Sequence, residues 1–501
     1  MQDNILEVVS PESVGVPSGA ILKTLRYFES LRLPLHSFLI LRHGKIAHEN
    51  YWTPFHQTRK HRMYSVSKSW VSLAVGLMID EGKLSLDDTV VSFFPEYMPP
   101  DAHEYLKRAT IRDMLRMADC HDSSTHWFGA PDWAKTWFDT PPTHPAGTIF
   151  SYNTTCTNLC CAIVEKIAGM NFIDYMYPRL LGPIGASDGI TCIEAPEGYS
   201  FGGSGVLCEP RDLARVALLC LNGGDWRGRR LISEQYIKEA TTRQIDNTLT
   251  TSDFNEQQGY GYQFWMTRHS GFACLGMGSQ FAICLSDLDM VIVVTADTQG
   301  IATAAHTIFE GLFNLLTPAV SGAPMPEDAA SNDELTKYSV GLALPLVVCP
   351  PHSPRATDAA APPAKGSISG RTYLFGDNPL NIRTVSFEIL SDEIAMTYEK
   401  PNGTYKLRFG VGNLIKQEFP EKHYSGMRIG TPAGRGYETY AGAAWAGDGT
   451  IIAKAYVTDD YLGSFNMNAT FKGDELVILM TKDAEGFLHD YTGFATGRRI
   501  L

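Results

Sequence analysis

The alternation of apolar and polar residues places predicted strands at both ends of residues 1–320 and predicted helices between them. Residues 37–52 alternate around a turn at His43–Gly44, which predicts a β-hairpin, and residues 280–295 predict a second strand pair. Apolar residues cover nearly every face of 67–81, which is typical of a buried helix. Further helices are expected over 111–117, 155–168, 210–221, 233–241 and 301–316.

These elements predict an α+β fold for residues 1–320. A hairpin by itself leaves its apolar face in water, so the strands from the two ends are expected to form one antiparallel sheet. Helices would flank this sheet, and the middle of the segment would be an all-helical insert.

The composition of the chain changes near residue 321. Prolines, alanines and small polar residues crowd between 321 and 365, which indicates a linker. From 366 to 501 the chain returns to alternating segments separated by glycine turns, a pattern typical of a small antiparallel β-barrel. We therefore predict one domain over 1–320, a linker over 321–365 and a barrel domain over 366–501.

Composition and charge exclude several classes of function. The 44% hydrophobic residues describe a folded chain, and 42 basic against 55 acidic residues give a formal net charge of −13. Such a surface repels nucleic acid and anionic membranes. The longest apolar stretch, 340–349, contains Pro345 and is shorter than the roughly 20 residues of a membrane span. The first residues lack a basic segment, so a cytoplasmic protein without a signal peptide is expected.

The cysteine and histidine patterns predict no metal site and no cofactor. The 10 cysteines are scattered without a C-x-x-C pair, and the 14 histidines form no H-E-x-x-H set. The chain also lacks a P-loop and a G-x-G-x-x-G motif, which argues against a bound nucleotide.

An S-x-x-K motif lies at the start of the predicted buried helix. Three residues are nearly one helical turn, so Ser65 and Lys68 share a face and their side chains can meet. Free N–H groups at the helix N-terminus favour an oxyanion, and burial favours a neutral lysine that can accept a proton. Ser65 is therefore a candidate nucleophile, although an N-cap serine beside a solvated lysine would give the same pattern.

Two later segments supply possible partners for this serine. Tyr152 lies in a turn-rich stretch before the helix 155–168, and it could relay a proton to a leaving group if a nearby positive charge lowers its pKa. Glycines in 274–280 permit close approach of the backbone to a ligand, so one N–H of this strand and that of Ser65 could form an oxyanion hole.

A serine, a lysine, a tyrosine and a glycine strand in this order resemble the serine β-lactamase and penicillin-binding-protein superfamily. The resemblance is greatest to class C β-lactamase-like esterases, amidases and D-aminopeptidases, and it covers roughly residues 11–316. The tail resembles the lipocalin-like domains that some members append.

The resemblance implies roles for individual residues. Ser65 would be acylated, Lys68 would be its general base partner, and Tyr152 would be the first residue of the family's Y-x-N motif. Thr154 stands at the third position of that motif, and Asn153 offers an amide beside it, so both are candidate substrate-binding residues.

The family's K-T-G strand is matched by Cys274–Leu275–Gly276, which implies that Gly276 contacts substrate and that Met277 joins Ser65 in the oxyanion hole. A second register, His269–Ser270–Gly271, resembles the H-x-G of some peptidases and stays open. Either register lacks the lysine that helps to hold the carboxylate of a β-lactam, so weak or no penicillin hydrolysis is expected.

We therefore expect a serine hydrolase that acts through an acyl-enzyme on a small-molecule ester or amide. A catalytically weak ligand-binding or sensor protein on the same fold, and an acyltransferase, are the alternatives. The natural substrate, the role of the tail and the oligomeric state stay open. Four aromatic residues would either wall an acyl pocket or pack inside the helical insert: Trp127, Phe128, Trp133 and Trp137.

Overall fold

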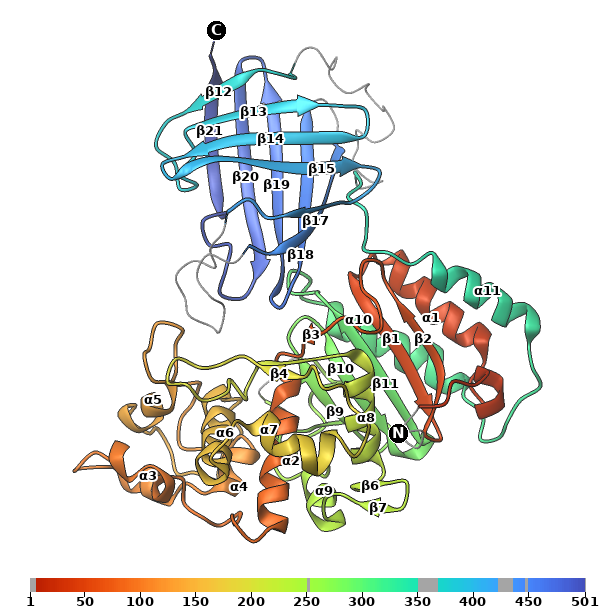
Figure 1. The fold of residues 1–501 in the computed structure, drawn as a ribbon, viewed down its shortest axis with the longest axis vertical. Coiled ribbons are helices and arrows are strands. Elements are labelled where there is room, and N and C mark those ends of the chain that lie inside the picture. The colour runs from red at the N-terminus through yellow and green to blue at the C-terminus, as the bar shows by residue number, and fades with distance from the viewer. Residues whose placement is uncertain (1–5, 250–252, 350–367, 422–435, 447–448, 501) are drawn as a thin grey trace. The chain divides into compact units, whose positions relative to one another are not determined.

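The computed structural model describes residues 6–249, 253–349, 368–421, 436–446 and 449–500 of the 501-residue chain (Figure 1). The chain forms two compact units, Met1–Leu344 and Pro345–Leu501. The large sheet of each unit is built from that unit's strands alone.

A six-stranded antiparallel sheet forms the centre of the first unit. Its strands are β1 (Leu35–Arg42), β2 (Lys45–Tyr51), β8 (Trp265–Thr267), β9 (Gly271–Gly276), β10 (Gln280–Leu285) and β11 (Met290–Ala296). Their order is β2-β1-β11-β10-β9-β8, so the N-terminal hairpin, red in Figure 1, lies beside the green strand β11. Phe38 of β1 is opposite Val294 of β11. The expected union of strands from both ends is confirmed.

Helices cover both faces of this sheet because both faces are apolar. Phe38 and Ile40 pack with residues of α1 (Ser18–Ser30) and α10 (Ala304–Gly311). Leu39 and Leu41, which point to the opposite face, belong to a core with α2 (Val66–Asp80) and α8 (Pro210–Leu221). All residues of α2 from Val66 to Met78 are buried, which agrees with the apolar pattern that predicted a buried helix.

The described part of the segment between β2 and β8 contains helices, short strands and the loops that join them. The predicted helices over 111–117, 155–168, 210–221, 233–241 and 301–316 are present, the last as α10 followed by a π-helical turn. The helices of the insert are α3 (Glu104–Arg108), α4 (Ile111–Leu115), α5 (Trp133–Asp139), α6 (Thr154–Ala168), α7 (Phe172–Met176) and α9 (Glu234–Ala240). The short strands are β3 (His61–Arg62), β4 (Thr191–Cys192), β5 (Val206–Cys208), β6 (Asp225–Trp226) and β7 (Arg229–Arg230).

Part of the predicted linker belongs to the first unit, which corrects the boundary at residue 320. Helix α11 (Ala329–Val340) packs on α1, where Leu335 is buried and Arg26 forms an ion pair with Glu334. The prolines around α11 suggested a linker, but the apolar side chains of Leu335 and Leu342 need cover from water. Residues 350–365 of the predicted linker lie outside the described residues.

The second unit is an antiparallel β-barrel, as predicted. The ten strands among its described residues form one sheet, and a parallel contact of β15 with β17, at Gly410 opposite Gly442, closes it. The strands are β12 (Thr372–Phe375), β13 (Thr384–Ile389), β14 (Glu393–Lys400), β15 (Gly403–Val411), β16 (Ile415–Glu418), β17 (Glu438–Trp445), β18 (Thr450–Thr458), β19 (Leu462–Lys472), β20 (Glu475–Ala484) and β21 (Gly493–Arg499).

No single helix in the described ranges is long and apolar enough to cross a membrane. The helices Thr154–Ala168 and Phe172–Leu181 reach the length and apolar composition of a membrane span only when they are taken together. The two are bent by 66° relative to each other.

Candidate active site

Ser65 stands at the N-terminus of α2 with Lys68 one turn further along. Ser65 is the N-cap residue, and Tyr64 before it has a left-handed φ of +46°, which turns the chain sharply into the helix. Lys68 Nζ lies 2.9 Å from Ser65 Oγ and donates to the carbonyl oxygen of Gly203 at 2.7 Å. Lys68 is 1% exposed, so the alternative of a solvated lysine is wrong.

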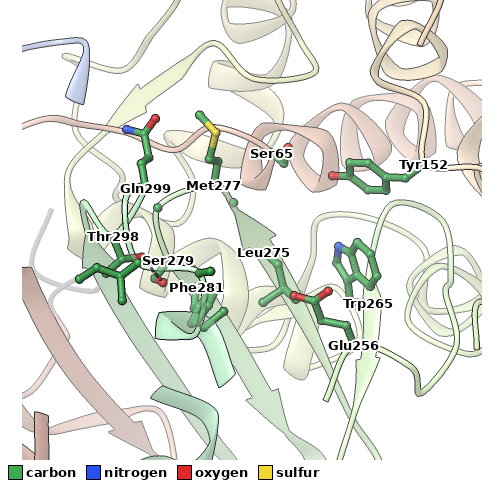
Figure 2. Close-up of a pocket in the computed structure, with 15 residues that line it drawn as sticks. Ser65, Tyr152, Glu256, Trp265, Leu275, Met277, Ser279, Phe281, Thr298 and Gln299 are labelled. Carbon is green, nitrogen blue, oxygen red and sulfur yellow. Dashed lines mark hydrogen bonds between the residues drawn. The ribbon is translucent and has the colours of Figure 1, made fainter. Parts of the chain in front are cut away.

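The hydroxyl of Tyr152 joins Ser65 and Lys68 in one cluster. Tyr152 and Ser65 line the same pocket, and Lys68 Nζ lies 5.0 Å from the centre of the Tyr152 ring. Figure 2 shows the ring directed at Ser65. The condition of a lowered pKa is not met: burial raises the pKa of the Tyr152 hydroxyl, and the neighbouring Ser65 side chain only opposes this rise. Tyr152 is therefore a neutral phenol at neutral pH.

The end of β9 approaches Ser65 because residue 276 is a glycine. A Cβ at Gly276 would lie 2.5 Å from the carbonyl oxygen of Met63 and 3.3 Å from the backbone nitrogen of Ser65. Gly276 and Met277 line the same pocket as Ser65. The side chain of Gln280 holds the turn that follows, because its Nε2 donates to the carbonyl oxygens of Met277 at 3.0 Å and Ala296 at 2.6 Å.

The fold decides between the two registers of the third motif. Cys274–Leu275–Gly276 ends β9 beside Ser65, whereas His269 precedes the first residue of that strand. His269 Nε2 lies 3.5 Å from Thr317 Oγ1, and its ring centre is 5.7 Å from that of Phe313. His269 is thus part of the packing at the far end of the strand.

Asn153 and Thr154, the expected substrate-binding residues, are not among the described residues that line this pocket. Asn153 is fully buried and caps α6: its Oδ1 accepts from the backbone N–H of Thr155 at 2.9 Å, and its Nδ2 donates to Asp119 Oδ2 at 3.1 Å. The backbone N–H of Thr154 donates to Ser124 Oγ at 2.8 Å. The side-chain amide of Asn153 is therefore engaged in capping α6.

A model of the Beta-lactamase family matches residues 29–310, which include Ser65, Lys68, Tyr152 and Gly276. The chain belongs to the β-lactamase family. Its matched segment covers the large sheet and the insert and ends before α11.

Two relatives extend this comparison. The chain is 28% identical to the 6-aminohexanoate-dimer hydrolase of Paenarthrobacter ureafaciens over 261 residues, which are 48% of this chain and 67% of the relative. A solved structure from Bacillus anthracis, described as a candidate 6-aminohexanoate-dimer hydrolase, superposes with a TM-score of 0.51 at 17% identity over 62% of this chain and 85% of the other. This second likeness concerns the fold.

The pocket of this β-lactamase-family chain, about 360 Å³ in volume, contains residues that carry no recognisable motif. Trp265 begins β8, Phe281 lies in β10, and the polar ones follow strand ends or lie in loops, so only their place in the fold brings them to Ser65. The polar and aromatic members that sequence analysis missed are Glu256, Trp265, Ser279, Phe281, Thr298 and Gln299.

His126 is a further neighbour of the cluster that the sequence did not reveal. Its Nδ1 lies 2.8 Å from Thr155 Oγ1, and its ring centre is 4.7 Å from that of Trp133. Burial first, and then the charge of Lys68, lower the pKa of His126 to about 4, so the imidazole is neutral at neutral pH.

Four aromatic residues that could have walled this pocket are absent from its described lining: Trp127, Phe128, Trp133 and Trp137. Trp133 and Trp137 are fully buried, and Trp137 Nε1 donates to Asp119 Oδ2 at 2.9 Å. Trp127 is exposed, and the pocket lining includes none of the three. Within the described part of the chain, no group of three or more His, Cys, Asp or Glu residues is placed to hold a metal ion.

Proposed function

We propose that this protein is a serine hydrolase that forms an acyl-enzyme at Ser65 and cleaves an ester or amide bond. The observation that carries the proposal is the cluster around Ser65 Oγ, with Lys68 Nζ at 2.9 Å and the Tyr152 hydroxyl directed at Ser65 in the same pocket (Figure 2). Two proton-transfer groups beside one hydroxyl, at a helix N-terminus and in a pocket, are what nucleophilic catalysis by serine requires.

In the proposed reaction, neutral Lys68 takes the proton of Ser65 while Oγ attacks the substrate carbonyl carbon. The backbone N–H groups of Ser65 and Met277 donate to the developing oxyanion. Tyr152, kept neutral by its raised pKa, gives its proton to the leaving group and regains one from Lys68. Water then attacks the acyl carbon by the same proton path in reverse, which releases the acid and restores Ser65.

Substrate class follows from the pocket and from the named relative. The name of the Paenarthrobacter protein states that it hydrolyses a 6-aminohexanoate dimer, which supports an amide substrate here. The described lining contains no Lys, Arg or His. A β-lactam carboxylate would therefore lack a cationic partner on this lining, so we propose little or no β-lactamase activity.

The test is incubation with activated esters, small amides and a chromogenic cephalosporin, followed by intact-mass and peptide-map analysis. We expect an adduct at Ser65, turnover of esters or amides, and loss of both in Ser65→Ala by at least about 10³-fold. Full turnover by Ser65→Ala would refute the proposal. Tight binding without an adduct would instead favour a ligand-binding protein, and products that incorporate an added alcohol would indicate acyl transfer.

A further inference from the structure

The amine of Lys68 has a second partner besides Ser65, the carbonyl oxygen of Gly203. Lys68 Nζ donates to this oxygen at 2.7 Å and lies 2.9 Å from Ser65 Oγ. A neutral amine has a single lone pair, and only this lone pair can take the proton of a serine. An N–H bound to a fixed carbonyl restricts rotation of the amine and can hold its lone pair toward Ser65. The position of the Gly203 carbonyl therefore sets the direction of the proposed base.

The loop that contains this glycine, residues 202–205, is held tightly before β5. The N–H groups of Ser204 and Gly205 donate to the carbonyl oxygen of Phe201 at 3.0 and 2.7 Å. Nε of the buried Arg62 donates to the carbonyl oxygen of Ser204 at 3.1 Å. Because Arg62 belongs to β3, the loop is fixed to the strand that leads into the serine.

Helix α6 holds the same loop through the side chain of Asn158. Its Oδ1 accepts from the backbone N–H of Gly203 at 3.0 Å, and the residue is 3% exposed. The helix comes this close because residue 203 is a glycine: a Cβ there would lie 2.5 Å from Cγ2 of Thr154 and 2.9 Å from Oδ1 of Asn158. Thr154 and Asn158 are about one helical turn apart, so both face the loop. Gly203 thus connects α6 to the amine of Lys68.

The side-chain amide of Asn158 is a poor choice for packing alone. Its Nδ2 is buried and has no hydrogen-bond partner among the described residues. A buried donor without an acceptor is unfavourable, and a leucine of similar size would avoid this penalty. The hydrogen bond of Oδ1 with Gly203 is therefore the interaction for which an amide is needed at this position.

We propose that Asn158 is a positioning residue for the general base. It holds Gly203 so that the carbonyl of this glycine keeps the Lys68 amine directed at Ser65. Asn158 is not among the described residues that line the pocket, so it acts on the reactivity of the serine through the loop and not through the substrate. This inference rests on the proposed acyl-enzyme chemistry and assigns a residue that supports its first step.

The test measures how fast Ser65 reacts with a small alkyl fluorophosphonate, a probe that does not depend on the natural substrate. In this reaction Oγ bonds to phosphorus, fluoride leaves, and Lys68 takes the proton of the serine. The second-order rate constant is obtained from the intact mass of the full-length protein over time. Hydrolysis of 4-nitrophenyl butanoate gives kcat/KM for the same variants, and thermal unfolding reports their stability.

Asn158→Leu should lower the labelling rate and kcat/KM by about 10- to 100-fold, because a displacement of a catalytic group by about 1 Å has an effect of this size. Its melting temperature should change little, since the substitution also removes the unpartnered Nδ2. Asn158→Asp keeps an oxygen that can accept from Gly203, so it should retain more of the rate than Asn158→Leu. Asn158→Ser, whose side chain is too short to reach Gly203, should also be slow and is the second variant if Asn158→Leu does not fold.

The matched control is Thr157→Val, which removes a buried hydrogen bond at the neighbouring position of α6. Thr157 Oγ1 donates to Gln263 Oε1 at 2.7 Å, and Thr157 is fully buried. This variant should have a lower melting temperature but the wild-type labelling rate, because it leaves the acceptor for Gly203 in place.

The outcomes separate this inference from the proposed function. The wild-type rate in the Leu and Ser variants of Asn158 would show that this residue does not position the base, and the hydrolase would stand. Equal slowing by Thr157→Val and by all three Asn158 variants would mean that a loosened α6 sets the rate, which would also overturn the inference. If wild-type Ser65 is not labelled and the ester is not hydrolysed, both proposals fall.

Discussion

The approach of β9 to Ser65 depends on the absence of a side chain at one residue. Gly276 lets the strand end come close to the backbone of Met63 and Ser65, and Gln280 fixes the carbonyl of Met277 beyond it. The two N–H groups proposed as oxyanion donors belong to Ser65 and Met277. Their separation is therefore set by contacts of backbone with backbone, where a shift of a few tenths of an ångström matters.

Gly276→Ala should lower kcat by about 10²-fold or more, because a Cβ 2.5 Å from the carbonyl oxygen of Met63 forces β9 away from Ser65. Steady-state kinetics on an activated ester would measure this loss. Gly322→Ala is the matched control, since a Cβ at Gly322 has no neighbour within 4 Å. Wild-type turnover by Gly276→Ala would mean that the end of β9 contributes no oxyanion donor.

At the scale of elements, a buried histidine pair joins β1 to β3, the short strand that leads to Ser65. His61 Nδ1 lies 3.0 Å from the carbonyl oxygen of Arg62, which can only accept, so Nδ1 carries the proton. His61 Nε2 is then the acceptor for His36 Nδ1 at 2.7 Å. Burial lowers the pKa of His61 to about 4 and lowers that of His36 well below its usual value.

This pair predicts that the first unit loses stability as the pH falls from about 6.5 to about 4. An unfolded histidine binds a proton near pH 6.5, whereas folded His61 stays neutral down to about 4, so the unfolded state holds more protons in this window. Stability should fall by roughly 1.4 kcal/mol per pH unit for each such histidine.

Urea unfolding followed by tryptophan fluorescence measures this slope. Of the 8 tryptophans, only Trp445 lies beyond Leu344, so the signal reports mainly on the first unit. His61→Gln should make the dependence on pH shallower within this window. An unchanged slope would show that His61 is protonated in the folded protein or exposed to water.

On the scale of the whole molecule, the first unit includes α11 and ends at Leu344, whereas the sequence predicted an end at residue 320. Leu335 of α11 is 2% exposed, and Tyr338 lies under the guanidinium of Arg26 of α1, 5.5 Å from the ring centre. The segment that follows the large sheet thus completes the burial of α1. The strands of the barrel come after this segment in the sequence.

A chain that ends at residue 344 should therefore unfold at a higher temperature than one that ends at residue 320. Loss of α11 uncovers α1, and burial of a leucine such as Leu335 contributes about 1.5–3 kcal/mol. Thermal unfolding of the two truncated proteins tests this, and Leu335→Asp in the full chain should have a similar effect. Equal melting temperatures for the two truncated proteins would indicate that the first unit ends at residue 320, as the sequence predicted.

Local patterns were enough for most elements and for the centre of the site. The apolar positions of 67–81 gave helix α2, and a spacing of three residues brought Lys68 to Ser65, because a helical turn fixes both. The same local reasoning leaves two explanations open for Asn153. Asn153 fits a substrate-binding motif and a helix cap equally well in sequence, and in the structure it caps α6.

By itself, the sequence determined the sheet with its helices, the barrel and the pairing of Ser65 with Lys68, since periodicity within one element encodes each of them. Only the tertiary structure decided that Gly276 rather than Gly271 meets Ser65, that α11 belongs to the first unit, and that Glu256 and Trp265 enter the pocket. These outcomes depend on contacts between segments far apart in the chain. Such contacts are determined by side-chain packing and by the burial of apolar surface, and a local sequence pattern does not encode either of them.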